Sequence, residues 1–159
     1  IHMITFFEYN WQVRSEWLEL CETLPKEELL KERVGGIGNI LHTLLHIVDV
    51  EYSWIRCIQG KPDVEFNFDK YETVESIRDL SNELQIECKQ FLQSRSSEME
   101  YNTPVKASWS KNEYTKGEIV RHIIAHEIHH IGQLSIWARE LGIQPISANL
   151  VGRNLIVHH

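Results

Sequence analysis

Hydrophobic residues recur every three or four positions in four long segments of the 159-residue chain. This spacing places them along one side of an α-helix, so that each segment can bury an apolar face. The expected helices cover about residues 4–24, 40–59, 73–95 and 116–141. Four such helices joined by loops predict an all-α fold, an up-and-down four-helix bundle.

The connections between these helices carry signals of their own. The segment 25–38 is charged and then rich in glycine, and because no strand precedes it, we interpret it as a turn rather than a phosphate loop. Residues 101–114 show no helical period, which predicts an irregular segment or a short hairpin before the last helix. Thr115 and Glu118 have the spacing of a capping box that starts this helix, and Gly142 should end it.

Composition limits the classes of function. A chain of this length with 42% hydrophobic residues suits a single domain, which we place at residues 3–157, with residues 1–2 interpreted as the remnant of an expression tag. The formal net charge of -7 argues against nucleic-acid binding. No apolar run is long enough to span a membrane, and the three cysteines lack C-x-x-C spacing. We therefore expect a cytoplasmic protein with no membrane or nucleic-acid partner.

The last predicted helix contains the most distinctive residues of the chain. His122, His126 and His130 are spaced four apart and form one stripe, on which Gln133 also falls. A histidine pair at this spacing is a common way to hold two ligands of a zinc or nickel ion. Because the whole stripe extends over about 12 Å, one ion can use His126 with His130, or His122 with His126. His129 lies to one side and either flanks the metal or faces solvent.

A third ligand is expected from another buried helix. His46 lies among aliphatic residues of the second predicted helix, where an unpaired imidazole would be costly. Taken alone, it would be interpreted as a core histidine bonded to Asp49 or to a backbone carbonyl. Together with a histidine pair on a facing helix, a shared metal explains it better. Three protein ligands leave one coordination position open, which is typical of catalytic sites.

Glu127 falls on the apolar side of the last helix, so its carboxylate needs a cation or a hydrogen-bond donor. Pairing with an arginine is the preferred interpretation. The alternatives are an acceptor for a ligand histidine and a general base acting on metal-bound water. The last alternative describes a zincin protease, since residues 126–130 satisfy H-E-x-x-H. No further zincin ligand pattern follows, and a protease is therefore the weaker hypothesis.

His46 with Asp49 and Glu51, followed downstream by residues 126–133, resembles the DinB/YfiT family of four-helix-bundle metalloproteins. The resemblance implies that His46, His126 and His130 bind one divalent metal ion, either zinc or nickel, with manganese as a further option.

The helix entry at residues 114–118 and the turn at residues 141–145 extend this resemblance over almost the whole chain. Ile131 departs from the family pattern, which commonly has a basic residue at this position.

The resemblance also implies a function. Family members with known activity include transferases that attach bacillithiol, mycothiol or glutathione to a substrate. We therefore expect a metal-dependent transferase that conjugates a low-molecular-weight thiol to a small electrophile, in a homodimer. A metal-binding or stress-associated module without turnover is the alternative, and a zincin-type hydrolase is a weaker one. The sequence assigns no catalytic side chain.

Overall fold

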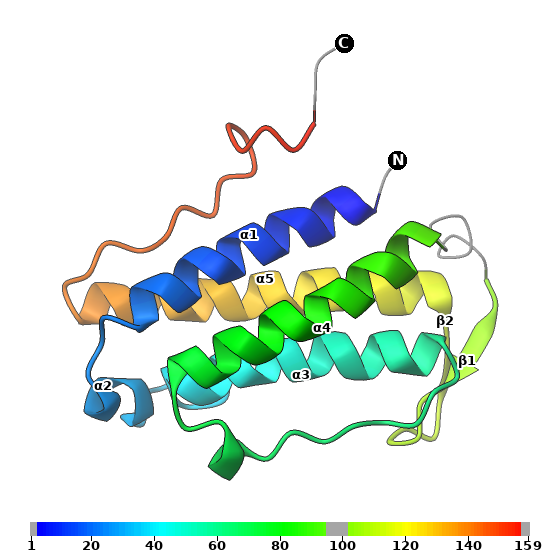
Figure 1. Cartoon of the computed structure of the whole chain (residues 1–159), viewed down its shortest axis with the longest axis horizontal. Helices are drawn as coiled ribbons and strands as arrows, with labels where there is room; N and C mark the ends of the chain where they lie inside the picture. Colours follow the sequence, from blue (N-terminus) through cyan, green and yellow to red (C-terminus); the bar gives the residue numbers. More distant parts are fainter. Residues whose placement is uncertain (1–2, 95–101, 157–159) are drawn as a thin grey trace.

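The computed structural model describes residues 3–94 and 102–156 and shows four long helices packed side by side (Figure 1). These helices are α1 (Ile4–Cys21), α3 (Ile40–Ile58), α4 (Val74–Ser94) and α5 (Lys116–Glu140). The connections hold a short helix α2 (Lys26–Leu30), a 3-10 turn η1 (Phe68–Lys70) and a hairpin of β1 (Pro104–Lys106) and β2 (Glu113–Thr115). The prediction of an all-α four-helix bundle with a hairpin before the last helix is confirmed.

The helices pack in the order α1, α4, α3, α5 around the bundle, and α5 closes the ring against α1. Figure 1 shows that α1 and α4 run antiparallel, as do α3 and α5. The connection between α3 and α4 runs back along the bundle through η1, so that these two helices point in the same direction (Figure 1). The strictly alternating up-and-down order that the sequence predicts is therefore wrong at this connection. The polar sequence between the two helices carries no sign of its direction, so the crossover is visible only in the structure.

The helix boundaries follow local chemistry. α5 begins as predicted, because Thr115 Oγ1 accepts a hydrogen bond from the Glu118 amide and the Glu118 carboxylate accepts one from the Thr115 amide at 2.8 Å. Gly142 follows α5 with a φ of 72°, a conformation that favours glycine and ends the helix. α1 ends earlier than predicted, at Cys21, and α2 was not predicted. In the described part of the chain, none of the helices combines the length and the apolar character of a membrane-spanning segment.

A buried charge network joins the four long helices. Arg14 of α1 is 2% exposed and donates from Nε to Glu127 of α5 at 2.9 Å. Its Nη2 lies 3.0 Å from Oε1 of Glu51 on α3, and its Nη1 lies 3.2 Å from the hydroxyl of Ser81 on α4. Trp11 donates its indole N–H to Glu51 at 3.0 Å. Burial disfavours a carboxylate and raises the pKa of Glu127 above its usual range, although Arg14 opposes this rise.

This network fixes how α5 is rotated about its axis. Successive residues of a helix point about 100° apart, so when Glu127 points to Arg14 in the core, His126 points to another side. That side is the groove where α5 packs against α3. The preferred interpretation of Glu127, a carboxylate paired with an arginine, agrees with the structure.

Replacing Arg14 with alanine should lower the free energy of unfolding by about 3–5 kcal/mol, because two buried carboxylates lose their cation. Urea denaturation followed by circular dichroism measures this loss. The matched control is Arg78→Ala, which breaks a 3.0 Å ion pair with the one-third-exposed Glu22 and should cost less than about 1 kcal/mol. Equal losses for the two variants would contradict the role assigned to the network.

Candidate metal centre

Three histidine side chains meet in the groove between α3 and α5. Nε2 of His126 lies 3.0 Å from Nε2 of His46 and 3.2 Å from Nε2 of His130. All three ligand atoms lie within 4.8 Å of one another, and among the described residues these histidines form the group that is positioned to bind a metal ion. The structure therefore brings together the three residues that the sequence and the family resemblance single out.

The spacing of these nitrogen atoms suits a divalent ion. Zinc binds histidine nitrogen at about 2.0–2.1 Å, and tetrahedral geometry then places two such nitrogens about 3.3 Å apart. Two of the three separations, 3.0 Å and 3.2 Å, are close to this value, and the third pair of nitrogens lies within 4.8 Å. One proton can be shared by only two of the three nitrogens, whereas one metal ion accepts lone pairs from all of them. The donor set consists of three imidazoles, which suit zinc, nickel and copper better than magnesium or calcium.

Burial keeps the three imidazoles in the form that binds metals. Desolvation lowers the pKa of His46, His126 and His130, and the neighbouring imidazoles lower it further for each. The effect is largest for His126, whose pKa falls to about 3. At neutral pH all three rings are neutral, and the ligand lone pairs are available without the loss of a proton.

Gln133 orients one of the ligands. Its Oε1 lies 2.8 Å from Nδ1 of His130, and since an amide oxygen can only accept, Nδ1 carries the proton. The lone pair of this ring is then on Nε2, the atom that faces the other two histidines. The amide nitrogen of Gln133 lies 3.3 Å from Nε2 of His129. Gln133 is therefore a pocket residue that selects the tautomer of His130.

The glycine-rich loop before α3 packs on the side-chain amide of Gln133. A Cβ at Gly36 would lie 2.2 Å from Oε1 of Gln133, and the φ of Gly36 is 52°, in the left-handed region. Only glycine permits this approach without displacing the amide. Interpreting residues 25–38 as a turn gave no indication that Gly36 contacts Gln133 at the histidine site. The glycines at positions 35, 36 and 38 were the available signal, but spacing alone does not show which side chain a loop touches.

The other histidines of the region have different neighbours. The exposed His122 packs edge-on against Trp54, with ring centroids 5.7 Å apart. His129 is exposed on α5 and contacts Gln133. His42 stacks on Phe68 at 4.1 Å, away from the three-nitrogen group. The sequence allows two metal-binding pairs on this helix, His126 with His130 or His122 with His126. The structure favours the first, because His130 and not His122 lies in the three-nitrogen group.

Asp49 and the three cysteines also lie outside the group. Asp49 accepts a hydrogen bond from Ser53 at 3.3 Å, and burial raises its pKa. The cysteines are buried and unpaired, at positions 21, 57 and 88. Burial raises the pKa of each thiol, to about 12 for Cys21.

Comparison with known proteins agrees with this fold. A sequence model of the DinB family matches residues 2–154, and the chain belongs to this family. The uncharacterized protein YizA of Bacillus subtilis (strain 168) is 53% identical over 154 residues, which cover 96% of each chain. The crystal structure of a DinB-like protein from Bacillus cereus ATCC 10987 superposes with a TM-score of 0.72, over 91% of this chain and 94% of that chain. At 18% identity, this last likeness shows the fold alone.

Replacing His46 with alanine should weaken zinc binding more than about 100-fold, since it removes the one ligand that α3 supplies. Zinc content after dialysis, measured by elemental analysis, should fall from about one ion per chain to near zero. His122→Ala is the matched control and should keep full occupancy. If His122→Ala loses the metal and His46→Ala retains it, the ligand assignment is wrong.

Replacing Gly36 with alanine should weaken zinc binding about 10–100-fold, because the added methyl group displaces the amide that orients His130. Gly35→Ala is the control, since Gly35 also has a positive φ, of 97°, but open space around its Cβ position. It should lower stability without changing zinc affinity. In a Gln133→Ala background, Gly36→Ala should have no further effect on affinity, and a full additional loss there would contradict the proposed contact.

Proposed function

We propose that this protein binds one divalent metal ion through His46, His126 and His130 and transfers a low-molecular-weight thiol to a small electrophile. The observation that carries the proposal is the convergence of three neutral imidazole nitrogens, without a fourth ligand in the group among the described residues. A site with three protein ligands retains positions for an exogenous ligand, whereas structural zinc sites are closed by four.

The metal ion, when bound, would supply the Lewis acidity that lowers the pKa of a coordinated thiol toward neutrality. In the transfer, the thiol proton passes to solvent, the sulfur forms a bond to the electrophilic carbon, and the leaving group departs with the electron pair of its broken bond. This reaction needs no oxidant or reductant. The chain's own cysteines do not compete as nucleophiles, because burial raises the pKa of their thiols.

The position of Glu127 argues against a zincin-type hydrolase. In such an enzyme the glutamate of H-E-x-x-H acts as general base beside the metal. Here Glu127 is 2% exposed and both of its carboxylate oxygens contact Arg14 in the core. This pairing occupies the carboxylate and directs it away from the groove that holds the histidines.

The zinc-loaded protein should accelerate the reaction of a thiol with monochlorobimane, in which sulfur displaces chloride and the product fluoresces. Bacillithiol, mycothiol and glutathione are tested in turn, with zinc, nickel and manganese. At least one combination should give a rate at least about tenfold above that of His46→Ala. Casein should not be cleaved. No thiol-dependent rate above the His46→Ala control would favour a metal-binding module without turnover, and chelator-sensitive casein cleavage that disappears in Glu127→Gln would favour a hydrolase.

A further inference from the structure

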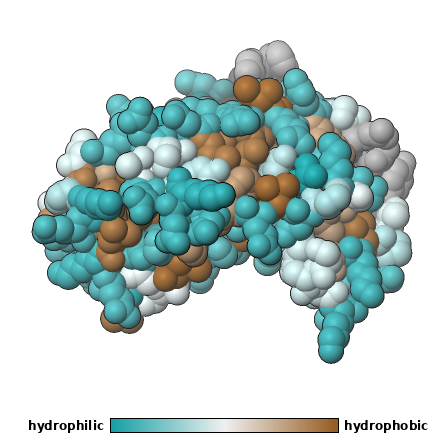
Figure 2. Space-filling view, turned by 60° about the horizontal axis from the view of Figure 1, so that its bottom comes forward, coloured by the Kyte–Doolittle hydropathy of each residue, from teal (hydrophilic) through white to brown (hydrophobic). Residues whose placement is uncertain are grey.

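A cavity opens beside the metal ligands, toward the hairpin. Its volume is about 280 Å³, and its lining comes from α3, β2 and α5: Trp54, Tyr114, Glu118, Ile119 and His122. This volume lies just below the usual range of ligand pockets, about 300–1,000 Å³, and suits one small ring system. We call it the aromatic cavity. Figure 2 shows the surface indented between the two ends of the bundle, with the smaller lobe at the end that carries the hairpin.

Aromatic rings form most of the wall. The Trp54 ring lies 6.0 Å from the Tyr114 ring and 5.7 Å from the His122 ring, with interplanar angles of 81° and 75°. Trp109 meets Trp54 at 4.9 Å and is itself 46% exposed. Rings set nearly perpendicular to one another offer both faces and edges, the surfaces that a flat aromatic guest contacts most favourably.

His122 connects the aromatic cavity to the metal centre. Its ring centroid lies 5.7 Å from that of Trp54 and 5.8 Å from that of His126, which is one of the three metal ligands. A ring held against Trp54 and His122 is therefore separated from a ligand of the metal by a single imidazole. This placement gives a role to His122, the histidine of the stripe that takes no part in the three-nitrogen group.

The charge at the aromatic cavity selects among aromatic ligands. Glu118 accepts hydrogen bonds from the amide and the hydroxyl of Thr115, at 2.8 Å and 3.0 Å, and these bonds lower its pKa, so that it remains ionised. The lining residues include no lysine or arginine. An anionic ligand would therefore meet a negative charge without a fixed cation to offset it, whereas an uncharged ring meets no such penalty.

We propose that the aromatic cavity binds the uncharged aromatic part of the electrophile and holds it beside the metal centre. The identity of this ligand as the electrophile rests on the proposed transferase function. Binding of the ring itself requires neither thiol nor metal, and the two proposals can therefore be tested separately.

The test is equilibrium dialysis of the protein, with and without zinc, against 1-naphthalenemethanol and 1-naphthoate, which share one ring system and differ in charge. The uncharged alcohol should bind with a Kd at least about tenfold lower than the carboxylate. Trp54→Leu and Tyr114→Leu should each raise its Kd about tenfold, since each removes one aromatic wall. Circular dichroism tests whether each variant is folded, and if Trp54→Leu does not fold, Tyr114→Leu alone carries the test.

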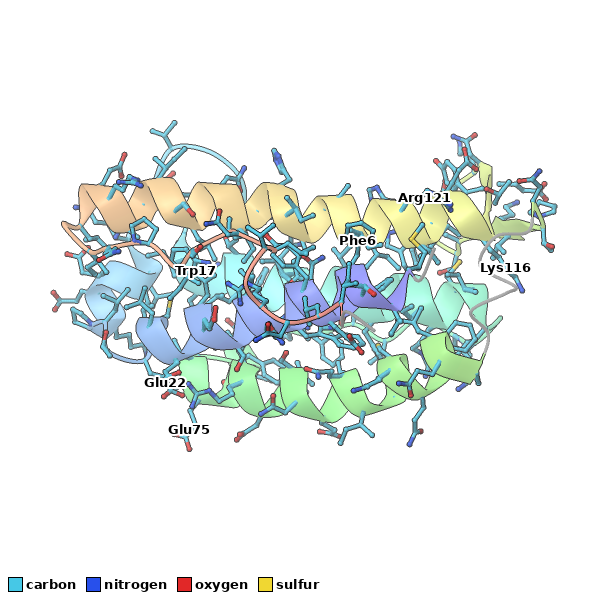
Figure 3. The ribbon with its side chains drawn as sticks, turned by 90° about the horizontal axis from the view of Figure 1, so that it is seen from above. Phe6, Trp17, Glu22, Glu75, Lys116 and Arg121 are labelled. Carbon is cyan, nitrogen blue, oxygen red and sulfur yellow. The ribbon has the colours of Figure 1, made fainter. Side chains whose placement is uncertain are left out.

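The matched control is Phe6→Leu. Phe6 is 41% exposed on α1, which lies across the bundle from α3 (Figure 3), and its replacement should leave the Kd unchanged. Equal binding of the two naphthalene compounds, or an unchanged Kd in both cavity variants, would overturn the inference.

Conjugation activity separates the two proposals. Selective binding of 1-naphthalenemethanol without any conjugation would support the proposed binding role of the aromatic cavity and contradict the transferase function. The alternative result is conjugation with the same KM for monochlorobimane in the wild type, Trp54→Leu and Tyr114→Leu. This result would contradict binding of the electrophile in the aromatic cavity and would support the transferase function.

Discussion

Arg14 is a buried guanidinium that holds one carboxylate of α3 and one of α5, and the metal centre depends on both contacts. A charge taken out of water is tolerated only when it is paired, so the two helices must turn Glu51 and Glu127 toward the same point. Helix geometry then sets the direction of the histidines on those helices. His46 and His126, which are 80 positions apart, reach 3.0 Å because their helices are held in this rotation.

The groove between α3 and α5 has a different chemistry at each end. At one end the glycine-rich loop presses on Gln133, which sets the tautomer of His130. At the other end Trp54 and His122 border the aromatic cavity. A polar end that fixes the ligands and an aromatic end that contacts an uncharged ring suit a reaction between a thiolate and an uncharged partner. The proposed transferase function places the thiol at the histidines and the electrophile at the tryptophan.

The parts of this arrangement that sequence could predict are those governed by local geometry. The spacing of His126 and His130 specifies a pair on one helix face, and Thr115 with Glu118 specifies where that helix begins. His46 is predicted as the third ligand because a metal shared with the histidine pair of a facing helix explains a buried imidazole better than a core hydrogen bond does, and because the family resemblance points to the same residue. The approach of the loop to Gln133, the choice of Arg14 as the partner of Glu127 and the crossover between α3 and α4 depend on contacts between distant segments, and no local pattern encodes them.

The most direct test of the account is zinc K-edge X-ray absorption of the loaded protein before and after addition of bacillithiol or glutathione. The account predicts about three imidazole nitrogens at 2.0–2.1 Å with one or two light oxygen ligands, and one sulfur at about 2.3 Å after the thiol is added. The chain's three cysteines are buried outside the histidine group, so such a sulfur comes from the added thiol. A shell closed by four protein ligands, unchanged by either thiol, would contradict the account.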